Sequence, residues 1–298
     1  MRIYLILLAL CALVTACSNE APPNPEWLED QIATIVELPD ELNEHSGMLA
    51  LTDSTLLGHN DSGDAPILYE FGASTKKLIR RIHVLQAAHK DWEELAQDEN
   101  YIYIGDFGNN RGARTDLVIY KVQKSELLQS DSVNAQTIAF TYPDQSDFSE
   151  RSKHRFDCEA MIALGDQLYL FTKNRDDAKT NLYQLDKTPG TQVAIPKSTF
   201  DVSGQITAAD LAVDSSDVLA LLGYDYQEGN FRPFIWLFYD YEGSSFFNGQ
   251  SKRIDLAFER QTEALCFRGS AKELVFSNEE EKENQGYVYG FDVAKWLD

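Results

Sequence analysis

Three glutamates, Glu93, Glu159 and Glu263, occupy equivalent places in this 298-residue sequence, and each opens a short apolar run. A polar turn and a second apolar run follow each of them. Carboxylates at the starts of similar strands can gather at one end of the strands and supply the oxygen ligands, roughly six to eight, that Ca²⁺ prefers. A cation held in this way can also polarise an ester or phosphoester and activate water. The residue types therefore fit either cation binding or metal-dependent hydrolysis.

Further polar residues stand next to the apolar runs and complete the candidate site. The predicted metal ligands are Glu93, Asp106, Glu159 and Glu263, and the expected cofactor is Ca²⁺ or another divalent cation. The candidates for an acid, base or nucleophile are Glu93, Asp106, Glu159, His45 and His154. The predicted ligand-binding residues are Asn60, Asp61, Asn109, Asn174, Arg175 and Asn278.

Each of these sets also has a structural interpretation. Asp, Asn and Gly recur in turns because their side chains bond nearby backbone groups, and we favour this interpretation for the Asn and Gly positions. A glutamate that opens a strand is not a turn former, so both roles stay open for the three glutamates. Each histidine alone fits a surface or loop-packing role, whereas with the carboxylates the histidines leave open a transition-metal site or a general base. Positively charged side chains near these residues either hold an anionic substrate or neutralise the acidic groups. We favour neutralisation for Arg111, Arg114, Lys173 and Arg175.

Several well-defined catalytic motifs are missing from the sequence. It contains no G-x-S-x-G, H-E-x-x-H, P-loop or G-x-G-x-x-G pattern. Serine-hydrolase, zincin and nucleotide-binding functions therefore have no motif to support them.

The pattern around Glu159 recurs along the chain at intervals of roughly 50 residues, as expected for a blade repeat of about 40 to 50 residues built of short strands. We predict an all-β fold, a β-propeller of four-stranded blades, with five blades favoured and six as the alternative. The five anchor segments are Ser46-Gly47-Met48, Glu93-Glu94-Leu95, Glu159-Ala160-Met161, Ala209-Asp210-Leu211 and Glu263-Ala264-Leu265.

The strand directions predict which residues share a face. The innermost strand of a blade begins on one face, and the antiparallel second strand ends on that face, so anchor carboxylates and residues after the second strands share one rim. The isolated strand from Ile32 to Leu38 is expected to complete the last blade and close the ring. The tail from Val293 to Asp298 is expected to form a short helix that packs Trp296 against the rim.

Charge and cysteine content restrict the partners. The chain has 48 acidic and 26 basic residues and a formal net charge of -22, which repels phosphate backbones and argues against nucleic-acid binding. A solvated surface accounts for most of this charge, and cations are the natural partners of the rest. Cys158 and Cys266 fall in blades that are not neighbours, so we expect two buried small side chains and no disulfide. We expect a monomer.

The N-terminus predicts export. Residues 1–16 contain one early arginine and an apolar run too short to span a bilayer, which is typical of a signal peptide. Val14-Thr15-Ala16-Cys17 resembles a bacterial lipobox with Cys17 as the lipidated residue, and ordinary cleavage is the alternative. Ser18 at the next position favours the outer membrane of a Gram-negative bacterium. Residues 17–26 form a proline-rich tether, and 27–298 form one propeller domain.

Several short motifs resemble those of a known group. His59-Asn60-Asp61-Ser62-Gly63, Asp91-Trp92-Glu93-Glu94-Leu95-Ala96, Gly105-Asp106-Phe107-Gly108-Asn109-Asn110 and Asp157-Cys158-Glu159-Ala160 resemble secreted bacterial β-propeller lipoproteins, and more distantly TolB-like and phytase-like esterase propellers. The resemblance spans roughly Glu44 to Asn278. It implies a site on the funnel face that contains Glu93, Asp106 and Glu159, with calcium as in the phytase-like group. The fourth anchor has Ala209 and the first has Ser46, which argues against a symmetric metal ring and favours blades two, three and five.

Two functions follow. The first is a lipoprotein anchored in the outer membrane that binds a cation, glycan or protein partner at its acidic channel face, with the lipid anchor as its only membrane contact. The alternative is a Ca-type metal-dependent phosphoester or ester hydrolase that uses the same face. The sequence leaves open whether the chain is an enzyme.

Overall fold

The computed structural model describes residues 26–27, 32–212, 218–269, 272–280 and 285–297. The predicted signal peptide, Cys17 and the tether up to residue 25 lie outside the described residues. Within the described part of the chain, no helix is long and apolar enough to cross a membrane.

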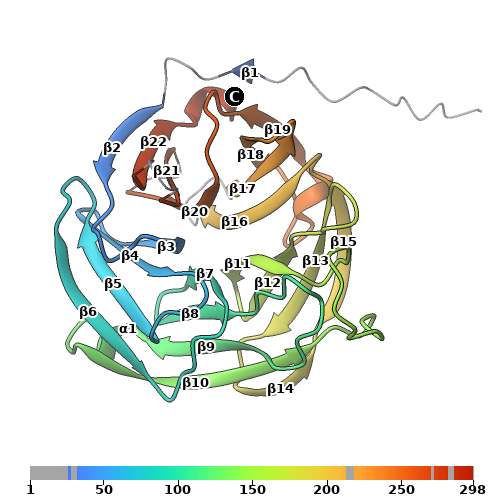
Figure 1. Ribbon diagram of the computed structural model, residues 1–298, viewed down its shortest axis with the longest axis horizontal. Helices are drawn as coiled ribbons and strands as arrows, with labels where there is room; N and C mark the ends of the chain where they lie inside the picture. Colours follow the sequence, from blue (N-terminus) through green and yellow to red (C-terminus); the bar gives the residue numbers. More distant parts are fainter. Residues whose placement is uncertain (1–25, 28–31, 213–217, 270–271, 281–284, 298) are drawn as a thin grey trace, which may run out of the picture.

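The described residues form a β-propeller of five four-stranded blades around a central channel, as predicted (Figure 1). From the channel outward, blade 1 consists of β3 (His45–Thr52), β4 (Thr55–Asn60), β5 (Ile67–Gly72) and β6 (Leu78–Leu85). Blade 2 consists of β7 (Trp92–Gln97), β8 (Tyr101–Asp106), β9 (Leu117–Gln123) and β10 (Ser132–Thr141). Blade 3 consists of β11 (Cys158–Leu164), β12 (Gln167–Thr172), β13 (Lys179–Asp186) and β15 (Ile195–Asp201). Blade 4 consists of β16 (Gln205–Ala212), β17 (Val218–Gln227), β18 (Asn230–Tyr239) and β19 (Gln250–Asp255). Blade 5 consists of β20 (Thr262–Phe267), β21 (Glu273–Asn278), β22 (Tyr287–Asp292) and β2 (Ala33–Glu37).

The N-terminal strand β2 closes the ring. It pairs antiparallel with β22, so the fifth blade joins segments from both ends of the described chain. The innermost strands β3, β7, β11, β16 and β20 neighbour one another in a closed circle around the channel. Closure removes the free sheet edge that the last blade would otherwise expose. This part of the prediction is confirmed.

Burial follows each strand's distance from the channel. The second strands β4, β8, β12 and β21 are buried after their first residue, because both faces of a blade pack against neighbouring blades. The outer strand β6 instead alternates between exposed and more buried side chains along much of its length. Uninterrupted apolar runs in the sequence therefore indicate inner strands, and alternating apolar and polar residues indicate outer strands.

Additional pairings join the outer rims of blades 1, 2 and 3. The strand β10 has ten residues, and the first of them pair in parallel with β6 of blade 1. A short strand β14 (Gly190–Val193), which the sequence did not indicate, pairs in parallel with the other end of β10. A further strand β1 (Glu26–Trp27), which includes the last tether residue, pairs in parallel with β19. These pairings cover edges of the outer strands that would otherwise have unpaired backbone groups.

The smaller elements agree with the sequence. The helix α1 (Lys124–Leu127) lies in the connection between β9 and β10 of blade 2. A 3₁₀ turn spans Ala294–Trp296, and the Trp296 ring lies edge-on to Phe291 with ring centroids 5.9 Å apart. Cys158 and Cys266 are buried free thiols, as expected.

Candidate cation site at the acidic mouth of the channel

A β-bulge near the start of each inner strand positions the side chains of the site. The pairing of inner and second strands skips one residue in every blade, and the skipped residues are Gly47, Glu93, Glu159, Thr207 and Glu263. A bulge leaves its extra residue out of the ladder and re-aims that side chain. The three predicted glutamates therefore leave their ladders at the same level, at the end of the channel where the inner strands begin.

The bulges correct the sequence alignment of two anchors. The bulged residue of blade 4 is Thr207, two residues before the predicted anchor Ala209, and that of blade 1 is Gly47 in place of Ser46. The sequence Thr207-Ala208 thus corresponds to Glu159-Ala160 and Glu263-Ala264. Blade 4 still contributes no carboxylate at this level, so the argument against a symmetric metal ring is unchanged, but the carboxylate cluster described next lies on blades 1 and 2 and not on the predicted blades two, three and five.

Three carboxylates at this end of the channel lie close enough to share one ion. Asp61 follows β4, Asp91 precedes β7, and Glu93 is the bulged residue of β7; their ligand oxygens all lie within 4.8 Å of one another. Gly108 lies directly against this group, because a Cβ at that position would overlap the Glu93 and Asp91 carboxylates. We use "acidic mouth" for this group together with Asp157, Glu159, Glu263, Glu279, Lys173 and Arg175.

The pKa values reflect burial and mutual repulsion. Burial, followed by repulsion from Glu159, Asp61, Asp91 and Asp157, raises the pKa of Glu93 well above its ordinary value. Burial, together with Asp61 and Asp157, raises the pKa of Asp91 to about 7. Burial also raises the pKa of Asp61. Such shifts mark a place where a bound cation would be strongly favoured over crowded negative charge.

Glu93 differs from the other two glutamates because its charge has no partner. Lys173 Nζ lies 2.8 Å from a Glu159 carboxylate oxygen, and Arg175 Nη2 lies 3.5 Å from the other. Gln261 Nε2 donates a 2.7 Å hydrogen bond to Glu263. Among the residues that the structure describes, none donates a hydrogen bond to the Glu93 carboxylate, although the residue is only 3% exposed.

A second carboxylate pair lies across the mouth in blade 5. Gln261 Nε2 donates to both Glu263 and Glu279, at 2.7 Å and 2.8 Å. Burial raises the pKa of Glu263 to about 7, and burial with repulsion from Glu263 and Asp61 raises the pKa of Glu279 to about 9. Glu279 follows β21 just as Asp61 follows β4, so its place after a second strand was the signal that could have identified it. Asp91, missing from the predicted ligands, stands two residues before Glu93.

The positively charged side chains of this face form ion pairs with acidic side chains, which is the role that we favoured from the sequence. Besides Lys173, Arg175 Nε contacts Asp157 at 2.5 Å. Arg114 pairs with Asp106 at 2.8 Å, and Arg111 pairs with Glu150 at 3.0 Å. Lys173 also lies over the Tyr224 ring, with Nζ 5.2 Å from its centroid.

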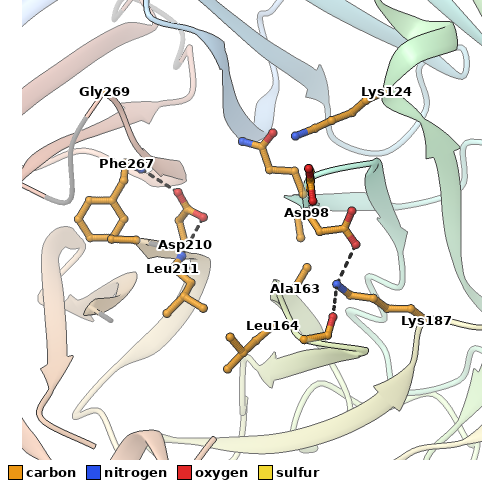
Figure 2. A pocket seen from close by; sticks show the side chains of 14 residues that line it. Asp98, Lys124, Ala163, Leu164, Lys187, Asp210, Leu211, Phe267 and Gly269 are labelled. Atoms are coloured by element: carbon orange, nitrogen blue, oxygen red, sulfur yellow. Dashed lines mark hydrogen bonds and ion pairs between the residues drawn. The ribbon is translucent and has the colours of Figure 1, made fainter. Parts of the chain in front are cut away.

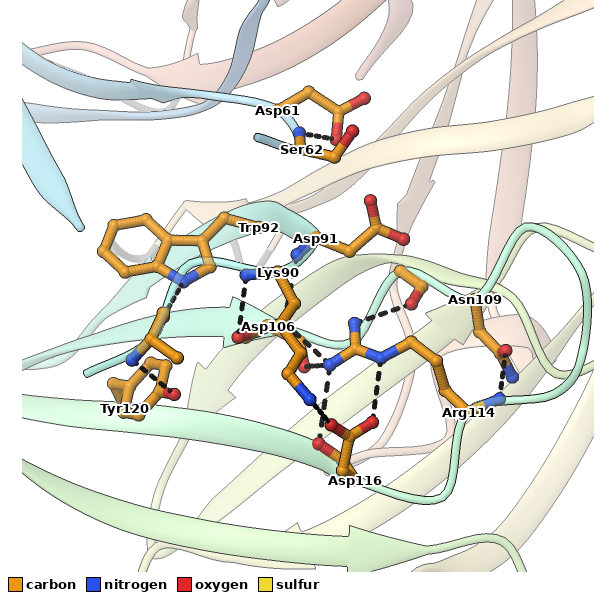
Figure 3. A network of polar contacts seen from close by, with 12 residues as sticks. Asp61, Ser62, Lys90, Asp91, Trp92, Asp106, Asn109, Arg114, Asp116 and Tyr120 are labelled. Atoms are coloured by element: carbon orange, nitrogen blue, oxygen red, sulfur yellow. Dashed lines mark hydrogen bonds and ion pairs between the residues drawn. The ribbon is translucent and has the colours of Figure 1, made fainter. Parts of the chain in front are cut away.

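Asp106 does not join the carboxylate cluster, contrary to the prediction. Its carboxylate accepts a hydrogen bond from the Asp91 backbone N–H at 3.1 Å and from Arg114 at 2.8 Å (Figure 3). Asp106 ends β8, where its side chain turns toward the loop before β7 and is neutralised by the guanidinium. It therefore positions the backbone that carries Asp91, while Asp91 and Asp61 face one another above it (Figure 3).

The two candidate histidines are buried, and neither belongs to the cluster of Asp61, Asp91 and Glu93. His45 is fully buried, its Nδ1 lies 2.8 Å from Ser277 Oγ, and burial lowers its pKa to about 3. His154 Nε2 lies 3.2 Å from the Asn110 carbonyl, and its Nδ1 accepts from the Phe156 N–H. Both are packing residues in this structure, the interpretation that the sequence favoured for each histidine alone.

The predicted Asn ligands instead shape turns. Amide groups of Asn60, Asn109, Asn174 and Asn278 bond nearby backbone or acidic groups. Asn278, for example, donates to the Glu279 carbonyl and accepts from the Tyr287 N–H. One oxygen, Asn60 Oδ1, is buried with no donor among the described residues. Of the predicted ligand-binding set, Asp61 and Arg175 are the members that lie in the acidic mouth.

No protein-family profile matches the sequence, and no curated protein sequence matches it. Among solved structures, extracellular domains 1–2 of Drosophila Semaphorin 1b are similar, with 11% identity and a TM-score of 0.37. The match covers 84% of this chain and 63% of that one, so the chain spans less than two thirds of the semaphorin structure.

Proposed function

We propose that this propeller binds a divalent cation of the Ca²⁺ type through Asp61, Asp91 and Glu93. The observation that carries the proposal is the Glu93 carboxylate, which is buried with no donor among the described residues and shares a 4.8 Å cluster with two further carboxylates. A buried unpaired carboxylate costs several kcal/mol unless it is protonated or meets a positive charge. A divalent ion supplies that charge.

The donor set favours a hard cation. All three groups offer carboxylate oxygens, which suit Ca²⁺ or Mg²⁺ better than the softer transition metals. Three side chains leave several of the roughly six to eight positions of Ca²⁺ for water or for oxygens of a partner. We therefore infer a binding module in which a glycan hydroxyl or a protein carboxylate completes the coordination.

The proposed setting is the cell envelope. A signal peptide in residues 1–16 and a lipid at Cys17 would tether the propeller to the outer membrane through residues 17–26. The formal net charge of -22 disfavours a direct approach to anionic lipid headgroups. The lipid anchor would then hold the protein at the membrane, and the cation would take part in recognition of the ligand.

A second candidate function is hydrolysis of a phosphoester or ester. It is favoured by one observation, that Glu263 has a pKa of about 7 and lies in the same mouth as the proposed cation and Arg175. A carboxyl that titrates near neutrality can accept a proton from an attacking water, and the cation would polarise the substrate. In this function Glu263 replaces the histidine or Asp106 as the candidate base.

Thermal melts of a soluble chain starting at Ser18 test the proposal. The protein is stripped with chelator and melted with and without Ca²⁺, Mg²⁺ or Zn²⁺, and elemental analysis gives the metal content. We expect Ca²⁺ to raise the midpoint of the wild type, and Glu93→Gln to remove this response. Asp53→Asn is the matched control, since it makes the same charge change at an exposed turn position. No shift with any ion would overturn the cation site.

Turnover separates the two functions. Calcium-dependent cleavage of p-nitrophenyl phosphate or acetate that Glu263→Gln abolishes, with the calcium melt shift retained, would establish the hydrolase. A calcium response with no turnover of either ester supports the binding module.

A further inference from the structure

A cavity opens at the opposite end of the channel from the acidic mouth. Its volume is about 540 Å³, within the size range of small-molecule sites. The last residues of the inner strands of blades 2 to 5 form much of its wall, and α1 contributes one side chain (Figure 2). Lining residues used below are Asp98, Lys124, Leu164, Lys187, Leu211 and Phe267.

Of the three acids that line this cavity, Asp98 and Asp210 form hydrogen bonds within the protein, and Glu99 is exposed to solvent. Asp210 accepts hydrogen bonds from the backbone N–H groups of Leu211 and Phe267, each at 2.8 Å (Figure 2). Asp98 contacts Lys187 Nζ at 2.8 Å, and it also accepts from Tyr103 and two backbone N–H groups. Hydrogen bonds from Lys187 and Tyr103, which outweigh its burial, lower the pKa of Asp98 to about 2. Burial raises the pKa of Asp210 to about 7 despite its two hydrogen bonds, so near neutral pH a large share of this carboxyl group carries no charge.

Lys124 is the lining cation that the protein leaves uncompensated. Its side chain is half-buried, and within the described residues no acceptor or acid contacts its ammonium group. Lys187 differs, because it is held between Asp98 and the Gly165 carbonyl. Burial lowers the pKa of Lys124, with Asp98 acting weakly in the other direction. A half-buried ammonium without a partner is unusual in a chain with net charge -22.

The wall across from Lys124 is mostly apolar, with the Asp210 carboxyl group between Phe267 and Leu211 (Figure 2). Leu164 and Phe267 are partly exposed to the cavity, and Leu211 lies between them. Figure 2 shows Lys124 reaching in from the side opposite Phe267 and Leu211. A ligand that fills the cavity would therefore meet a positive group at one end and hydrocarbon at the other.

We propose that this cavity binds a small monocarboxylate with an apolar body, with its carboxylate on Lys124 and its apolar part on Leu164, Leu211 and Phe267. The charge-assisted hydrogen bond to the ammonium would orient the ligand, and burial of hydrocarbon would supply most of the affinity. The site is separate from the acidic mouth, whose negative groups would repel the same ligand.

Calorimetric titration of the full chain with octanoate tests the proposal, with octylamine and octanol as probes of the same length and different charge. We expect octanoate to bind with one site per chain, octanol more weakly, and octylamine not at all. Lys124→Gln should weaken octanoate binding at least about tenfold, while leaving octanol binding unchanged. Leu164→Asp should abolish binding of octanoate by placing a like charge in the apolar wall.

Lys121→Gln is the matched control, because Lys121 lies on β9 with Nζ 4.1 Å from the Tyr101 ring centroid and does not line this cavity. It should bind octanoate like the wild type. Octanoate binding that persists unchanged in Lys124→Gln, stronger binding of octylamine, or no binding of octanoate at millimolar concentration would each overturn the proposal.

Discussion

The Glu94 carboxylate of blade 2 accepts a hydrogen bond from the backbone N–H of Ala209 in blade 4, at 2.8 Å across the channel. The inner strand of a blade has no further strand on its channel side, so its N–H groups there need other acceptors. Glu94 is fully buried and serves this purpose for two strands, since it also accepts from the Leu95 N–H of its own strand at 2.9 Å. In the channel, the Glu94 side chain thus accepts backbone hydrogen bonds of the kind that a neighbouring strand accepts elsewhere in the blade.

The first prediction concerns this bond. Glu94→Gln keeps the shape of the side chain but turns an NH₂ group toward N–H donors, which leaves a buried donor unsatisfied. We expect a loss of about 1–3 kcal/mol in the free energy of unfolding, measured by urea denaturation. Glu99→Gln, at an exposed position, is the control and should change stability little. Equal stability of both variants would mean that Glu94 does not tie the inner strands together.

The second prediction concerns stability above neutral pH. Asp91 and Glu263 have pKa values of about 7, and Glu279 has a pKa of about 9, so the folded protein holds protons that the unfolded chain releases near pH 4. This contribution is fully present below the unfolded pKa values and is lost as the pH rises through 7 to 9. The metal-free protein should therefore melt at a lower temperature at pH 9 than at pH 6. Added Ca²⁺ should reduce this difference, and a melting temperature that rises from pH 6 to 9 would contradict the prediction.

The third prediction concerns acid. Burial lowers the pKa of both His45 and His59 to about 3, and each is fully buried with Nε2 unpartnered. For a base with a lowered pKa, the stability is present above the unfolded value near 6.5 and is lost as the pH falls toward 3. His59→Phe keeps the ring beside Trp92 but cannot take a proton. We expect a smaller loss of stability between pH 6.5 and 4 than in the wild type, although the variant starts from a lower value because the bond to the Asn60 carbonyl is lost. An unchanged slope would exclude His59 as a cause of acid sensitivity.

The blade repeat could be recognised in the sequence because every blade places the same local requirement on its strands. Each blade requires two short apolar strands near the channel, and this requirement repeats in every blade, so the blade number and the ring closure by β2 could be predicted. The rim strand β14 could not, because a four-residue strand at an exposed edge has no apolar pattern of its own. The pairing of β10 with β6 depends on distant backbone contacts that leave no mark on side-chain periodicity.

The site was predicted in part for the same reason. Glu93, Glu159 and Glu263 stood out because their position recurs, and Asp61 because it follows a second strand. The role of Asp106 could not be foreseen, because it depends on Arg114, which reaches it from the loop after β8. The bulges that set the level of each glutamate are a feature of strand pairing, so the sequence placed the anchor of blade 4 two residues too late.

The fourth prediction tests the close approach of Gly108 to the proposed site. A Cβ here would collide with the flexible ends of Glu93 and Asp91, so Gly108→Ala should push the two carboxylates apart. We expect calcium affinity to fall at least about tenfold, with a small effect on the melting temperature of the metal-free protein. Gly229→Ala is the control with the opposite profile, since Gly229, between β17 and β18, has φ +90° and open space around it. It should cost about 1 kcal/mol of stability and leave calcium affinity unchanged. Equal calcium affinity in wild type and Gly108→Ala would argue against the site.

The last prediction separates the charge of Glu93 from its role as a ligand. In the metal-free protein, burial and repulsion from four carboxylates raise the pKa of Glu93, and no described residue donates a hydrogen bond to it, so its ionised form destabilises the fold. Because a carboxyl group with a raised pKa costs more stability as the pH rises, Glu93→Gln should raise the melting temperature of the metal-free protein, and should raise it more at pH 8 than at pH 5. With saturating Ca²⁺ the order should reverse, because only the wild type gains binding energy. Glu159→Gln is the comparison, since it breaks the 2.8 Å contact with buried Lys173 and should destabilise the protein with or without calcium. If Glu93→Gln instead lowers the metal-free melting temperature at pH 8, Glu93 makes a stabilising contact of its own, and the case for an ion at Asp61, Asp91 and Glu93 loses its main support.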